Sequence, residues 1–122
     1  MARLRTDIFV SALLRRVSVA GGMGMIVAKG FEEAGALHVE WRFAGRVGLL
    51  APAPSALHLP SPDEDRDERR FVVGPETDDA AIASRMASER RFDPDCWHVE
   101  IEGVDPRTVL EIVADEADGA DL

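Results

Sequence analysis

The fold is decided by residues 84–102, which read SRMASERRFDPDCWHVEIE. Pro94 ends a helix here, because proline cannot join the helical hydrogen bonds and pushes the preceding residue out of the α region. We expect this helix to begin at Thr77, as its N-cap, and to run to about Arg91. Residues 96–102 then alternate between apolar and polar side chains, which is typical of a half-buried strand.

The same alternation occurs in residues 35–43, and the two strands together predict one sheet with two different faces. The apolar face has Leu37, Val39, Trp41, Phe43, Trp97, Val99 and Ile101. The polar face has His38, Glu40, Arg42, Cys96, His98, Glu100 and Glu102. We expect Trp97 to anchor the core, because one indole ring can bury up to about 250 Å².

The other elements follow from periodicity and turn residues. A first helix is expected over residues 7–19, with Thr6 as its N-cap. Further strands are expected at residues 23–29, 46–51 and, less regularly, 70–73, with Ala44-Gly45 as the tight turn after residues 35–43. Asp105-Pro106 fits the N-cap and first position of a short helix, whereas residues 109–113 fit either the continuation of that helix or a last strand.

This order, α-β-β-β-(β)-α-β-α, predicts a single α+β domain over residues 1–114. Short connections favour an antiparallel sheet of four to five strands, with the two main helices on one face. The other face is then expected to remain open and polar. We expect the Pro-rich, acidic loop at about residues 52–69 to be mobile and the acidic tail at residues 115–122 to be frayed.

Composition narrows the classes of function. The 122-residue chain has a net charge of −9, which is unfavourable for binding nucleic acid phosphates. It has no apolar run near the 18 or so residues of a membrane helix, so we expect no membrane partner. Its single cysteine excludes an internal disulfide and fits a reducing, cytoplasmic location.

Several motifs resemble those of a known family. They are RTDIFVSA at residues 5–12 with Arg15-Arg16, EAG at residues 33–35, ERRFDPD at residues 89–95, and the following Trp97 and Val99-Glu100. Over about residues 3–113 the chain resembles the alphaproteobacterial family catalogued as domain of unknown function 1491. The resemblance implies a bacterial cytoplasmic protein of similar length, and it carries no activity, cofactor or catalytic residue.

The candidate chemistry lies on the polar face of the sheet. His38 and Glu40 project from one strand, and Cys96 and His98 from another, so neighbouring strands would bring four zinc-ligand types together. The spacing is not that of a CxxC or HxxxH motif. A nucleophilic Cys96 activated by His98 is less favourable, because side chains two residues apart on a strand are about 7 Å apart.

Three other patterns have simpler structural explanations. Gly21-Gly22-Met23-Gly24 follows a helix, so it is a helix C-cap turn rather than a phosphate loop. Glu40-Trp41-Arg42 is the nearest approach to the Glu-x-Lys of restriction-endonuclease-like metal sites, and no matching aspartate precedes it. Arg90, Arg91, Asp93 and Asp95 fit a structured helix end better than a binding site.

Two hypotheses for the function remain. The first is a small non-catalytic interaction module that acts through an open sheet face or an edge strand, with a second copy of the chain or another protein as its partner. The alternative is a small metal-binding protein or enzyme that uses His38, Glu40, Cys96 and His98. We favour the first and expect no cofactor, because no pair of these groups has the spacing that catalysis requires.

Overall fold

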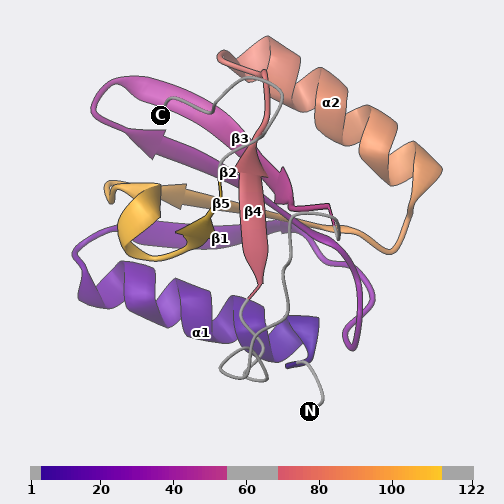
Figure 1. Ribbon diagram of the computed structural model, residues 1–122, viewed down its shortest axis with the longest axis horizontal. Coiled ribbons are helices and arrows are strands. Elements are labelled where there is room, and N and C mark those ends of the chain that lie inside the picture. Colours follow the sequence, from indigo (N-terminus) through magenta and orange to yellow (C-terminus); the bar gives the residue numbers. More distant parts are fainter. Residues whose placement is uncertain (1–3, 55–68, 114–122) are drawn as a thin grey trace.

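A six-stranded mixed sheet with one helix on each side forms the described part of the chain, residues 4–54 and 69–113, in the computed structural model (Figure 1). The elements in chain order are α1 (Thr6–Val19), β1 (Met23–Ala28), β2 (Leu37–Phe43), β3 (Arg46–Pro52), β4 (Arg70–Val73), α2 (Asp79–Phe92), β5 (Trp97–Glu102), the 3-10 helix η2 (Pro106–Thr108) and β6 (Glu111–Ile112). Most of the loop predicted to be mobile and the whole tail predicted to be frayed lie outside the described residues.

The strands are arranged in the order β1-β5-β2-β3-β4-β6. The pairs β1–β5, β2–β3 and β3–β4 are antiparallel, whereas β2–β5 and β4–β6 are parallel. The prediction of a purely antiparallel sheet with four to five strands was therefore wrong. The crossover through α2 returns the chain to the end of the sheet where β2 begins, so β5 enters parallel to β2 and separates it from β1. The sixth strand comes from the segment for which helix and strand were both considered.

The two helices lie on opposite sides of the sheet, which corrects the expectation that they share one face (Figure 1). α1 covers the predicted apolar face and buries Phe9, Val10, Leu13 and Val17 there. Trp41 and Trp97 belong to that same core, as predicted. α2 covers the predicted polar face, where its buried residues are Ile82 and Met86. The connection from β4 to β5, which contains α2, crosses the face of the sheet opposite α1.

The helix ends differ in detail from the prediction. Asp78, not Thr77, caps α2, and its carboxylate accepts a hydrogen bond from Ala81 N at 2.8 Å. Thr6 is the first residue of α1 and not its cap, and its hydroxyl donates to the carbonyl oxygen of Gly35 at 2.8 Å. α2 ends at Phe92, as the proline that follows requires.

Both helices have 14 residues, and no helix in the described ranges is long and apolar enough to cross a membrane.

Two predicted turns are confirmed. Ala44 and Gly45 both have positive φ, 55° and 76°, as the two-residue turn between β2 and β3 requires. Gly21 has φ 93°, and its N–H donates to the carbonyl oxygen of Ser18 at the end of α1. Residues 21–24 are thus a helix C-cap followed by a strand.

Candidate functional site

A layer of polar side chains is enclosed between the sheet and α2. His38 and Glu40 on β2 and His98 on β5 are each less than 9% exposed. His38 lies directly opposite His98, because β2 and β5 are paired in parallel. His98 Nε2 is 2.9 Å from Glu40 Oε1, so the imidazole and the carboxylate form a buried hydrogen bond. We call these three residues the polar layer.

Arg42 connects this layer to α2. Its guanidinium donates to Glu40 Oε2 and to Glu100 Oε2, each at 2.8 Å, and also to Asp79 in the first turn of α2. The hydrogen bond with Asp79, followed by the one with Glu100, raises the pKa of Arg42. The Arg42 side chain therefore links β2, β5 and α2.

His38 is held as a neutral imidazole beneath α2. Burial lowers its pKa, the Arg85 and His98 charges lower it further, and the Glu89 and Asp93 carboxylates act in the opposite direction. Its Nε2 is 3.9 Å from Glu89 Oε1. Its Nδ1 is buried and has no hydrogen-bond partner among residues 4–54 and 69–113.

Because His38 is buried in this environment, we expect the protein to lose stability in acid. The His38→Gln variant should lose less stability over the same pH range. A histidine whose pKa is lowered by folding binds fewer protons in the folded state than in the unfolded state. Its contribution to stability is complete above the unfolded pKa of about 6.5 and is lost as the pH falls toward the lower folded value. We expect the free energy of unfolding, measured by urea titration, to fall less between about pH 7.5 and about pH 5.5 in His38→Gln than in the wild type. An equal or larger fall in the variant would contradict a neutral buried imidazole at this position.

Cys96 has a different environment from the three residues of the polar layer. It packs in an apolar cluster with Leu49, Ile82 and Met86 under α2, and burial raises the pKa of its thiol. A raised pKa keeps the sulfur in the weakly nucleophilic thiol form. His98, the base considered for it, is hydrogen-bonded to Glu40 instead.

The structure thus brings together three of the four residues predicted as zinc ligands. In the described part of the chain, no group of three or more His, Cys, Asp or Glu side chains is arranged to hold a metal ion. A site built from His38, Glu40, Cys96 and His98 stays a prediction. The helix end at Asp93, by contrast, has the structural role that was expected, because its side chain accepts a hydrogen bond from Asp95 N at 3.1 Å.

β1 is an exposed edge strand. Its apolar side chains, Met23, Met25, Ile26 and Val27, are between 42% and 72% exposed. Because Met23 pairs with Glu102 and Met25 with Glu100, both methionines lie on the α2 side of the sheet, beyond the area that α2 covers. The sequence predicted this strand but gave no sign that it forms an edge.

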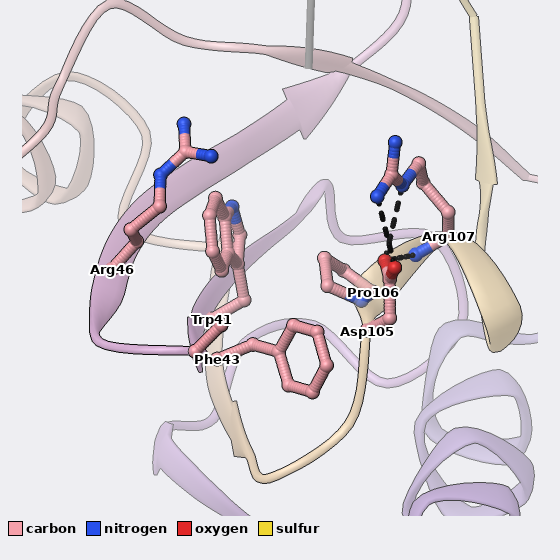
Figure 2. A pocket seen from close by; sticks show the side chains of 7 residues that line it. Trp41, Phe43, Arg46, Asp105, Pro106 and Arg107 are labelled. Carbon is pink, nitrogen blue, oxygen red and sulfur yellow. Dashed lines mark hydrogen bonds and ion pairs between the residues drawn. The ribbon is translucent and has the colours of Figure 1, made fainter.

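A small pocket lies on the other face of the sheet, at the turn between β2 and β3 (Figure 2). It is lined by Trp41, Phe43, Arg46, Asp105, Pro106 and Arg107. The Asp105 carboxylate accepts hydrogen bonds from Arg107 N, Nε and a terminal nitrogen at 3.0, 3.1 and 2.9 Å. These bonds lower the pKa of Asp105 and fix the start of η2. Sequence reasoning missed this pocket, because its two walls are about 60 residues apart in the chain.

Together these features define a small α+β protein with a six-stranded mixed sheet between two helices. The chain belongs to the family described as "Protein of unknown function (DUF1491)", whose model matches residues 4–111. This confirms the family suggested by the RRFDPD motif and its neighbours.

Solved structures of similar proteins agree with this assignment. The solution structure of protein Atu0922 from A. tumefaciens is 43% identical, with a TM-score of 0.77 over 93% of this chain and 98% of that one. A crystal structure of a DUF1491 family protein from Caulobacter crescentus CB15 is 29% identical, with a TM-score of 0.73 over 92% and 99% of the two chains. An NMR structure of a DUF1491 family protein from the same organism is 29% identical, with a TM-score of 0.72 over 95% and 100%. No curated protein matches the chain.

Proposed function

We propose that this protein is a non-catalytic, cytoplasmic interaction module that binds an extended, basic segment of another protein along β1. The observation that carries the proposal is the exposure of an apolar strand at the edge of the sheet. β5 is the one strand paired with β1 within residues 4–54 and 69–113. The outer edge of β1 therefore presents backbone N–H and C=O groups that an added strand satisfies.

The side chains of β1 favour a protein partner over solvent. Soluble proteins protect long edge strands with charges, prolines or covering segments. β1, by contrast, reads MGMIVA from Met23 to Ala28 and carries no charge. Met23 and Met25 share one face of this short strand, and exposed apolar side chains gathered in this way mark interaction sites.

The charge beside β1 specifies what kind of segment binds. Glu100 and Glu102 lie next to the two methionines on the same face, and Arg42 connects Glu100 to Glu40 and Asp79. One guanidinium and four carboxylates give this region a net charge of −3. A partner strand with lysine or arginine beside its apolar residues complements it, whereas a second acidic copy of this chain repels it.

The chemistry of the polar layer also supports a binding role over catalysis. Its imidazole and carboxylate are hydrogen-bonded to each other beneath α2, and the one thiol lies in an apolar cluster with a raised pKa. In this arrangement the layer stabilises the helix against the sheet.

A matched pair of peptides tests the proposal. We expect a capped hexapeptide of alternating valine and lysine to bind the wild type, and one of alternating valine and glutamate to bind far more weakly. Met25→Lys should weaken binding of the lysine peptide by about 10-fold, because it adds a like charge and removes apolar contact area. Phe92→Lys is the control, since Phe92 is 92% exposed at the end of α2. Fluorescence anisotropy of labelled peptides gives the dissociation constants.

Three outcomes would contradict the proposal. The first is equal affinity for the two peptides, and the second is equal weakening by Met25→Lys and Phe92→Lys. The third is a dimer in light scattering that Met25→Lys dissociates, because a second copy of this chain would then be the occupant of β1.

A further inference from the structure

We propose that the pocket between the β2–β3 turn and η2 binds a carboxylate that carries a single aromatic ring. This site is independent of the β1 surface. Trp41 lies on the face of the sheet that α1 covers, whereas Met23 and Met25 lie on the opposite face.

The volume of the pocket limits its occupant to one ring. The pocket encloses about 160 Å³. Sites for drug-sized ligands and cofactors have about 300–1,000 Å³, whereas a cavity of about 150 Å³ holds benzene. A single six-membered ring therefore matches the space, and any further part of a ligand lies outside the pocket.

The walls of the pocket suit a flat apolar group. Figure 2 shows the Trp41 ring on one side, Pro106 on the other and the Phe43 ring below them. Phe43 is 38% exposed, so it offers ring surface that packing within the protein leaves free. An aromatic ligand gains from such a site through apolar burial and ring-to-ring contact.

The charge at the rim selects a carboxylate. Arg107 is neutralised by Asp105, with which it forms an ion pair at 2.9 Å. The Arg46 side chain is exposed, and its guanidinium makes no hydrogen bond or ion pair with any of the described residues. Among residues 4–54 and 69–113 the rim therefore has one positive charge that no described carboxylate pairs with, although the whole chain carries −9. Both guanidinium groups lie toward the same end of the pocket in Figure 2. A carboxylate there pairs with Arg46, while an ammonium ligand is repelled.

Two kinds of ligand carry a carboxylate and a single aromatic ring. They are a free aromatic acid and a peptide whose C-terminal residue is phenylalanine. The test uses phenylacetate as the probe, with benzyl alcohol and benzylamine as its neutral and cationic counterparts. Binding is followed by the shift of the Trp41 indole N–H signal in a ¹⁵N–¹H spectrum, which Trp41→Phe assigns. At millimolar concentration we expect phenylacetate to give a saturable shift, benzyl alcohol to bind about 10-fold more weakly, and benzylamine to give no shift.

Two variants with matched controls locate the ligand. Arg46→Gln should weaken phenylacetate binding by about 10-fold, and Arg15→Gln, which changes an exposed arginine on α1, should leave it unchanged. Phe43→Ala should weaken binding to a similar degree, and Phe92→Ala should leave it unchanged.

The affinity of the peptide Gly-Gly-Phe is then compared with that of phenylacetate, to distinguish a peptide terminus from a free aromatic acid as the ligand. Tighter binding of its free-acid form than of phenylacetate, lost on C-terminal amidation, assigns the site to a peptide terminus. Weaker binding of the peptide than of phenylacetate assigns it to a free acid. The inference is overturned if phenylacetate causes no shift, if benzylamine binds equally well, or if Arg46→Gln binds as the wild type does.

Discussion

Leu13→Asp is expected to abolish folding. Leu13 is fully buried on α1, between Val10 and Val17, and it faces the sheet. The substitution removes a buried leucine, which costs about 2–5 kcal/mol, and leaves an unpaired carboxylate in an apolar core. The sum, about 5 kcal/mol or more, equals or exceeds the stability of many small domains. Circular dichroism and the dispersion of a ¹⁵N–¹H spectrum should show an unfolded chain.

Ile8→Asp is the matched control for this prediction. Ile8 lies on the same helix and is 48% exposed, so the same change should keep the fold with only a small shift in Tm. If Leu13→Asp melted as the wild type does, α1 would not be a core helix. Unchanged melting together with lost self-association would make α1 an interface instead.

Trp97→Ala is expected to cost about 3–5 kcal/mol. Trp97 is the largest fully buried side chain, and its indole N–H donates to the carbonyl oxygen of Phe31 at 2.9 Å. Gly30 and Gly35 approach the ring so closely that an added Cβ would lie 2.7 and 2.9 Å from Trp97 Cδ1. The loop between β1 and β2 is thus shaped around this ring, and its removal leaves a large cavity that the loop cannot fill.

Trp97→Phe separates the packing of this ring from its hydrogen bond. Phenylalanine keeps most of the apolar volume and loses the donor to Phe31, so we expect a cost clearly smaller than that of alanine. Urea titration gives both values. Equal costs for the two variants would show that the hydrogen bond, and not burial, makes Trp97 important.

The local structure and the two faces of the sheet could be predicted from the sequence, because strand alternation is a local signal. Trp97, Val99 and Ile101 were assigned to the core, and all three are buried there. Asp93-Pro94 fixed the end of the preceding helix, and α2 ends at Phe92. Each of these features depends on neighbours within a few residues.

The position of α2 and the parallel strand pairs could not be predicted in this way. α2 buries only Ile82 and Met86 among the described residues, and it also contacts the sheet through an exposed ion pair of Asp79 with Arg42. So narrow an apolar stripe does not show which face of the sheet the helix covers. The insertion of β5 between β1 and β2 depends on contacts between segments 60 to 79 residues apart, which no local pattern encodes.

The candidate site likewise combines features that could be predicted from the sequence with contacts that could not. His38, Glu40 and His98 were assigned to one polar face, and the structure places all three under α2. The contact between Glu40 and His98 arises because two strands far apart in sequence become neighbours. Cys96 follows the same alternation, yet it packs with Met86 and other apolar residues, because this part of α2 presents its apolar stripe.

Amide hydrogen exchange along β1 tests the central claim most directly. In the free protein, the outward-facing amides between Met23 and Ala28 should exchange fast, since an unpaired edge leaves them exposed to water. Saturation with the valine-lysine peptide should slow these amides by about 10-fold or more and leave those of β3, in the interior of the sheet, unchanged. Binding of the peptide without protection of β1, or with protection spread over other surfaces, would contradict a partner strand at this edge.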